Sequence, residues 1–245
     1  MPITSVPWSD LVGEMQTGDL ILFSGISNES EWIKIFTGGQ FSHSTMIYLP
    51  DPTQPPQLWQ EAPEAIAPDP HTQTSHTGAQ LGDALTATTN IYLNFGDSPY
   101  YVKLNWERPS NLAQTVLNVV NEYEGRPFGT VLEMALNYAL GHLYNQGTEQ
   151  SAIYCAELVA LTFQAIGILD TSHPPNWYSP NSFGTSEKNP ITWLDGVIVS
   201  EPVQILLPSP AQIPRAKGPD LLWPAGPLAP SELAMPPVAS RELFG

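Results

Sequence analysis

Proline is the feature that most restricts how this chain can fold. The 245 residues include 26 prolines, about twice the usual frequency of roughly 5%. Proline donates no backbone hydrogen bond and interrupts helices and central strands, so its clusters separate the segments that can form regular structure. The clusters lie at 50–70, at 174–190 and, most densely, at 208–237. The sequence therefore predicts a folded domain over residues 1–207 and a flexible, proline-rich tail over residues 208–245.

Charge excludes several classes of function. The chain has 24 Asp and Glu residues against 8 Lys and Arg, a formal net charge of −16. Such a surface repels nucleic-acid phosphates and anionic membranes, so we expect neither as a partner. The N-terminal residues lack the basic and apolar regions of a secretory signal, and no apolar run approaches the roughly 20 residues of a membrane span. The expectation is a soluble, cytoplasmic protein without stable membrane insertion.

Strand patterns precede and follow a helical middle. Alternating or continuous apolar runs bounded by turn residues predict strands, and apolar stripes at helical spacing predict helices. The predicted strands are 19–24, 41–49, 58–62, 90–95, 102–106 and 196–207, and the predicted helices are 30–36, 110–125, 130–144 and 153–167. This order indicates an α+β fold with an antiparallel sheet packed on a small group of helices, rather than a regular βαβ alternation.

Cys155 is the only cysteine, and it lies at the start of the predicted helix 153–167. A single cysteine makes no internal disulfide, zinc finger or iron–sulfur cluster. The positive end of the helix dipole and the free backbone N–H groups favour a thiolate there, and the same groups can hold an oxyanion. Cys155 is therefore a candidate nucleophile, and the alternative is a small, buried, inert residue.

His43 and Glu61 are the candidate partners of the thiol. Alternation along 41–49 places His43 and Ile47 on one face of the strand. If 41–49 and 58–62 form a hairpin, the midpoint of positions 43 and 61 falls at 52, inside the loop, so the two side chains are near neighbours. A carboxylate beside an imidazole fixes its tautomer and orientation. The alternatives are a core histidine, a surface glutamate at position 61, and Glu64 as the carboxylate.

These residues together resemble a known family. The blocks are 17–23 (TGDLILF), 41–48 (FSHSTMIY), the strand with Glu61, and 154–159 (YCAELV). They look like the permuted papain-like cysteine amidases of the YaeF/YiiX type, relatives of NlpC-type cell-wall peptidases and of lecithin:retinol acyltransferase. The resemblance implies a circularly permuted papain-like fold. It also implies Cys155 as nucleophile, His43 as base and Glu61 as the orienting residue.

Other residues are weaker candidates. Tyr154 and Ser42 are candidates for the substrate or oxyanion region, and Tyr154 is equally suited to packing. The chain departs from the family where Phe128 and Gly129 follow the turn at 125–127, and where Ala156 replaces a serine. The histidines at 71 and 76, with an aspartate at 69, match neither a helix face nor a strand pair, so we expect a loop there, no metal and no cofactor.

Three functions follow. The first is a cysteine hydrolase that cleaves the amide bond of a small peptide or amino-acid amide through an acyl-enzyme. The second is a lipid acyl hydrolase or acyltransferase with a lipid-like substrate, which a long apolar groove beside Cys155 would favour. The third is an inactive binding module that retains the fold. The proline-rich tail can in addition recruit a protein partner through polyproline recognition.

Overall fold

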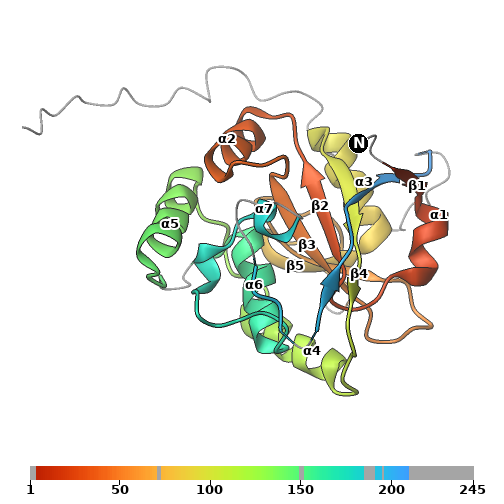
Figure 1. Cartoon of the computed structure of the whole chain (residues 1–245). Helices are drawn as coiled ribbons and strands as arrows, with labels where there is room; N and C mark the ends of the chain where they lie inside the picture. The colour runs from red at the N-terminus through yellow and green to blue at the C-terminus, as the bar shows by residue number, and fades with distance from the viewer. Residues whose placement is uncertain (1–3, 71–72, 149–151, 185–190, 195, 210–245) are drawn as a thin grey trace, which may run out of the picture. The chain divides into compact units, whose positions relative to one another are not determined.

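A seven-stranded sheet organises the described residues, which are 4–70, 73–148, 152–184, 191–194 and 196–209 of the computed structural model (Figure 1). The strand order is β1-β9-β6-β2-β3-β4-β5, and neighbours are antiparallel except for the parallel pair β1 and β9. The strands are β1 (Ser5–Pro7), β2 (Leu20–Ser24), β3 (His43–Tyr48), β4 (Gln57–Ala62), β5 (Gly78–Asp83), β6 (Ser98–Val102) and β9 (Val203–Leu206), and a separate pair is formed by β7 (Leu104–Asn105) and β8 (Ile198–Val199).

Helices cover both faces of this sheet. On one face, which we call the α6 face, α4 (Leu112–Tyr123) and α6 (Cys155–Ala165) pack with Leu22, Met46 and Trp59. On the opposite face, the α3 face, α1 (Trp8–Leu11) and α3 (Ala84–Phe95) pack with Phe23, Ile47 and Leu58. Alternate residues of β2, β3 and β4 thus enter two different hydrophobic clusters. The face on which a side chain lies decides which groups it can reach.

The predicted α+β class is confirmed, with three corrections to the elements. Residues 90–95, predicted as a strand, form the end of α3, which Asp83 caps by accepting a hydrogen bond from the Thr86 backbone N–H and which Gly96 ends in the left-handed region. The strand β5 was not predicted, because its two glycines and two polar residues give no apolar pattern. The predicted strand 196–207 is divided into β8 and β9.

Asp19 explains the Thr-Gly-Asp block at 17–19 as a structural feature. Its fully buried carboxylate accepts hydrogen bonds from Tyr101 Oη at 2.5 Å, from the Leu104 backbone N–H at 3.0 Å and from Arg108 Nη2 at 3.0 Å. A buried carboxylate is tolerated only when its hydrogen bonds are satisfied in this way. The block therefore fixes the start of β2 against β6 and β7.

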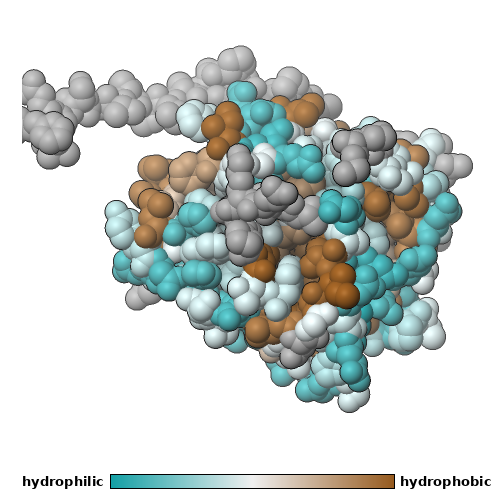
Figure 2. Space-filling model, in the orientation of Figure 1, coloured by the Kyte–Doolittle hydropathy of each residue, from teal (hydrophilic) through white to brown (hydrophobic). Residues whose placement is uncertain are grey.

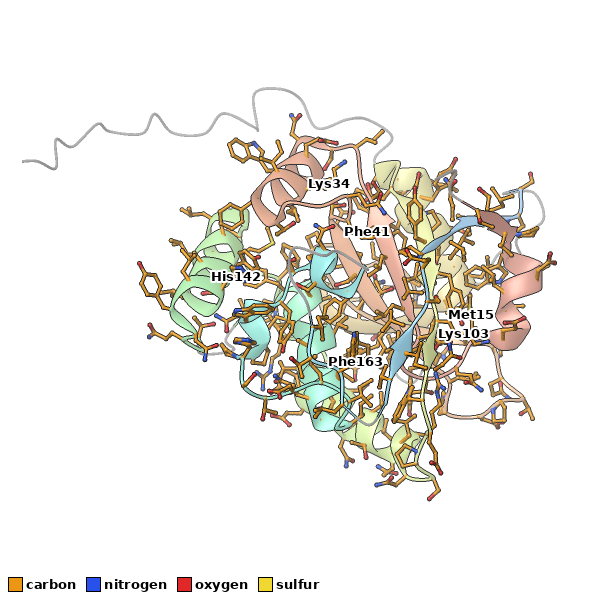
Figure 3. All side chains as sticks on the ribbon, in the orientation of Figure 1. Met15, Lys34, Phe41, Lys103, His142 and Phe163 are labelled. Carbon is orange, nitrogen blue, oxygen red and sulfur yellow. The ribbon has the colours of Figure 1, made fainter. Side chains whose placement is uncertain are left out.

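The remaining helices surround the N-terminal end of α6. They are α2 (Asn28–Thr37), α5 (Val131–Tyr144) and α7 (Pro180–Phe183), together with the short 3₁₀ helix η2 (Pro175–Trp177). The side chain of Asn181 in α7 accepts a hydrogen bond from Phe41 N at 2.7 Å and donates to Thr37 Oγ1 at 2.6 Å, so it joins α7 to the end of α2 and the start of β3. Figure 3 labels Phe41 and also Phe163 of α6, whose ring meets that of Phe183 edge-on at 5.8 Å.

The described part of the chain contains no helix that is both long and apolar enough to cross a membrane. The first 3 residues of the predicted domain and nearly all of the predicted tail, residues 210–245, lie outside the described residues. The predicted boundary at 207 and the polyproline role of the tail therefore stay predictions.

Candidate functional site

Cys155 is the first residue of α6, with Tyr154 as the N-cap residue. The indole N–H of Trp59 in β4 donates to Thr162 Oγ1 at 3.1 Å, and this buried hydrogen bond fixes α6 against the sheet. The helix packs on β3 and β4, and Cys155 is only 5% exposed. The predicted position of the thiol at a helix N-terminus is thus confirmed.

The sheet presents Ser44 and Glu61 to this thiol. The pairing of β3 with β4 sets Met46 opposite Trp59, and the same register, extended by two residues, aligns Ser44 with Glu61. The backbone and hydroxyl of Ser44 lie close enough to Cys155 to favour its thiolate, and Cys155 is one of the neighbouring acids that raise the pKa of Glu61. Ser44, Glu61 and Cys155 therefore form one buried group on the α6 face.

His43 lies on the α3 face, so the predicted contact between His43 and Cys155 is wrong. Its ring packs against that of Phe23, with centroids 5.5 Å apart, and its Nε2–H donates to Gln60 Oε1 at 3.2 Å. Phe23 is the cross-strand partner of His43, as Leu22 is of Ser44. Since neighbouring residues of a strand point to opposite faces, the backbone of the sheet separates the imidazole from the thiol.

Burial sets the protonation states of this group. Glu61 is fully buried, neither of its carboxyl oxygens has a hydrogen-bond partner among the described residues, and burial with the charges of Cys155 and Glu157 raises its pKa to about 10. Burial raises the pKa of Glu157 to about 7, although the Tyr154 backbone N–H favours its carboxylate. At neutral pH, Glu61 is a neutral acid and Glu157 is close to half ionised.

The thiol itself is kept neutral. Burial raises the pKa of Cys155, and this effect outweighs the contributions of Ser44 and of the N-terminal backbone amides of α6, which lower it. On the α3 face, burial lowers the pKa of His43, while the Gln60 hydrogen bond and the Asp97 carboxylate raise it. A thiolate–imidazolium pair of the kind that activates cysteine hydrolases is therefore not assembled here.

Ser42 and Tyr154 both line the pocket next to Cys155. The Ser42 hydroxyl is already engaged, since it accepts a hydrogen bond from Gly25 N at 2.9 Å and donates to Phe23 O at 3.3 Å. The buried Tyr154 hydroxyl has no hydrogen-bond partner among the described residues, and its ring fills the space beside Gly129, where a Cβ atom would lie 2.3 Å from the hydroxyl oxygen. Ser42 thus joins β2 to β3, and Tyr154 packs on the glycine that departs from the family pattern.

An apolar pocket of about 250 Å³ opens above Cys155. Its walls come from α2, from α5 and from the segment between η2 and α7, and the rings of Phe36 and Tyr138 meet across the α2–α5 boundary at 5.5 Å. Figure 2 shows hydrophobic residues gathered over α2 and α5, where the outer side chains of Trp32 and Leu136 are 68% and 56% exposed. The lining residues are Trp32, Ile33, Phe36, Thr37, Ser42, Met134, Ala135, Tyr138, Tyr154, Cys155, Ala156, Glu157, Asn176, Tyr178, Ser179 and Pro180.

A second cluster of titratable side chains lies apart from Cys155. Asp69 and His76, for which the sequence predicts a loop without a metal, lie together with Glu124 from the end of α4. His71 lies outside the described residues. Glu124 is about 50 positions away in the sequence, so spacing alone gave no sign of it.

No family model and no curated protein matches the chain. Among solved structures, the chain is similar to the metalloprotein YiiX from Escherichia coli O157:H7, with a TM-score of 0.43 and 14% sequence identity over 63% of this chain and 69% of that chain. This is a distant likeness, and the site described above stands on the geometry of the chain itself.

Proposed function

We propose that this protein binds an uncharged, acyl-chain-like ligand in the pocket above Cys155, as a binding module with a permuted papain-like arrangement. The observation that carries the proposal is the lining of the pocket, in which aromatic and aliphatic side chains of α2 and α5 predominate. Apolar walls with a few polar groups at one end are typical of sites for small apolar ligands. At about 250 Å³, the pocket fits a short acyl chain.

The charge of the protein selects among apolar ligands. The formal net charge is −16, and Glu157 lies in the pocket wall. A free fatty-acid anion would be repelled by both, whereas a neutral ester or amide would not. The acyl carbonyl end then lies at the floor of the pocket, near the backbone amides that begin α6.

One experiment measures occupancy of the pocket. An uncharged, pyrene-labelled acyl methyl ester is titrated into the full chain and into two variants, Ala135→Trp, which fills the pocket, and Leu143→Trp, which adds the same side chain at a 70% exposed position of the same helix. We expect saturable binding in the wild type and in Leu143→Trp, and at least tenfold weaker binding in Ala135→Trp. Equal binding by both variants, or no binding by the wild type, would refute the proposal.

A second candidate is a thiol-dependent acyl hydrolase or acyltransferase. The observation in its favour is that Cys155 reaches the pocket at a helix N-terminus, where its own backbone amide and that of Ala156 favour the thiolate. Glu157, which lines the same pocket and has a pKa of about 7, is the base that this candidate requires in place of the imidazole. It takes the thiol proton as sulfur attacks the acyl carbonyl, and returns it to the leaving group when the acyl-enzyme forms. The apolar lining favours an acyl ester over a peptide or amino-acid amide.

Alkylation by iodoacetamide separates the two candidates, because every label reports the single cysteine. For the binding module, the rate stays low below the free-thiol pKa of about 8.5, and a bound acyl ester protects the thiol. Fast labelling near pH 6, lost in Glu157→Gln, would establish the hydrolase instead. In either case, His43→Ala leaves the rate unchanged.

A further inference from the structure

Asp69, His76 and Glu124 meet where the segment before β5 reaches the end of α4. One potential ligand atom from each of these residues lies within 4.8 Å of the other two. The site around Cys155 uses none of them. Imidazole nitrogen and carboxylate oxygen are both common ligands of divalent metal ions.

The backbone fixes the segments that carry this cluster. Asp69 N donates to Thr74 O at 2.8 Å, which closes the loop that follows Asp69. Gly125 N donates to Ala79 O at 2.7 Å, which joins the residue after Glu124 to the second residue of β5. These two backbone hydrogen bonds hold Asp69 and the residue after Glu124 against described parts of the chain.

The imidazole of His76 is oriented as in a metal ligand. Its Nδ1 lies 3.2 Å from Thr77 O, and because a carbonyl oxygen only accepts, Nδ1 carries the proton. Nε2 faces Glu124, whose Oε1 is 3.6 Å away, and the two form an ion pair when the ring is protonated. When the ring is neutral, the lone pair of Nε2 is available to a metal ion held between it and Glu124. Metal-bound histidines usually donate their second ring N–H to a carbonyl or carboxylate in this way.

The two carboxyl groups of this cluster also favour the binding of a cation. Asp69 is only 1% exposed. A divalent ion held between Asp69 and Glu124 would balance the charge of two carboxylates that lie close together.

We infer that Asp69, His76 and Glu124 form a binding site for a divalent metal ion. Of the ions used in the test below, we expect Zn²⁺ to bind most tightly. Bonds of about 2.1 Å in a tetrahedral centre place ligand atoms about 3.4 Å apart, close to the 3.6 Å between His76 Nε2 and Glu124 Oε1. The side chains of His76 and Glu124 are 26% and 23% exposed, so an ion can enter and a water molecule can complete the coordination. Nitrogen and oxygen ligands without thiolate suit Zn²⁺, Mn²⁺ and Fe²⁺.

The ion would stabilise the edge of the sheet that borders the Cys155 group. Ala79 in β5 pairs with Glu61 in β4, and the residues just before β5 carry His76. Metal binding would therefore join α4 to β5 and hold the strand beside Glu61. This role is structural and is independent of the ligand in the pocket.

The test uses the full chain after removal of metals with EDTA. Titration with Co²⁺ and then competition with Zn²⁺ should give one equivalent of bound ion, with visible ligand-field bands and no thiolate charge-transfer band. Glu124→Gln and His76→Ala should weaken binding by at least the roughly 10- to 100-fold that loss of an outer-shell partner costs. Glu122→Gln, which removes an exposed carboxylate from the same helix, should bind as the wild type does.

Thermal unfolding supplies a second measurement. Zn²⁺ should raise the Tm of the wild type and of Glu122→Gln but not that of Glu124→Gln, a conservative variant that decides the matter if His76→Ala does not fold. Absence of saturable binding, or equal binding by Glu124→Gln and the wild type, would overturn the inference. A thiolate charge-transfer band that disappears in Cys155→Ser would overturn it as well, because the ion would then lie at Cys155.

Discussion

The two faces of the sheet, compared at neighbouring residues of β3, carry opposite kinds of titratable group. On the α6 face, Ser44 adjoins Glu61 and Cys155, which are acids whose pKa values burial raises. On the α3 face, His43 adjoins Gln60 and is a base whose pKa burial lowers. Burial therefore favours the neutral forms of Glu61, Cys155 and His43, and the sheet between the two faces prevents the base from taking the proton of the thiol. If the register of β3 were shifted by one residue, His43 would take the place of Ser44 on the α6 face, as in an imidazole-activated cysteine.

The largest expected effect comes from removing the acid on the α6 face. Glu61 titrates at about 10 in the folded chain against 4.5 in the unfolded chain. Its contribution to stability is complete below pH 4.5 and is lost as the pH rises toward 10. At 1.36 kcal/mol per pKa unit, Glu61→Gln should raise the free energy of unfolding by up to about 3 kcal/mol at pH 7, and by almost nothing at pH 4.

Urea unfolding at both pH values measures this difference. Glu122→Gln, at an exposed position, serves as the matched control and should leave the pH dependence unchanged. A stability gain for Glu61→Gln that is the same at pH 4 and pH 7 would mean that Glu61 is not held as a neutral acid.

The α3 face should respond to pH in the opposite direction. The pKa of His43 is lowered in the folded chain, so its contribution to stability is present above about pH 6.5 and is lost as the pH falls below that value. This single group changes the free energy of unfolding by no more than about 1.4 kcal/mol per pH unit. His43→Gln, which can keep a hydrogen bond to Gln60, should therefore unfold with a flatter acid dependence than the wild type. An unchanged slope between pH 6.5 and pH 5 would contradict the assignment.

The smallest expected effect concerns the thiol. Ser44→Ala removes a hydroxyl that favours the Cys155 thiolate, so iodoacetamide labelling at pH 8 should slow about two- to tenfold, the equivalent of one modest hydrogen bond. His43→Ala is the paired control from the other face and should not change the rate. If His43→Ala slows labelling and Ser44→Ala does not, the assignment of the two faces is reversed.

The sequence predicted correctly those features that depend on a local pattern, and it failed where the strand register determines which face a side chain lies on. Cys155 at a helix N-terminus followed from local pattern and is confirmed. The prediction that His43 lies beside Glu61 assumed a hairpin whose midpoint is residue 52. In the observed pairing of Met46 with Trp59, the midpoint lies half a residue later. That shift brings Ser44, not His43, opposite Glu61. Apolar alternation could not correct it, because β3 and β4 are covered on both faces and show almost continuous burial.

Two further errors have similar physical causes. The aromatic and β-branched residues of 90–95 suggested a strand, but the Asp83 cap and Gly96 at the end define a helix with Ala84, Ala87 and Ile91 on its buried side. The cap was the signal that could have found α3. The meeting of Asp69 and His76 with Glu124 depends on how β5 pairs with the end of α4, and no local pattern encodes that contact.

The buried carboxyl groups of the α6 face also determine how many protons accompany folding. At pH 7, Glu61 is protonated and Glu157 about half protonated in the folded chain, whereas both are ionised in the unfolded chain. Unfolding at neutral pH thus releases about one and a half protons from these two residues. The folded protein carries correspondingly less negative charge than its formal −16, and its calorimetric unfolding enthalpy should vary with the ionisation enthalpy of the buffer.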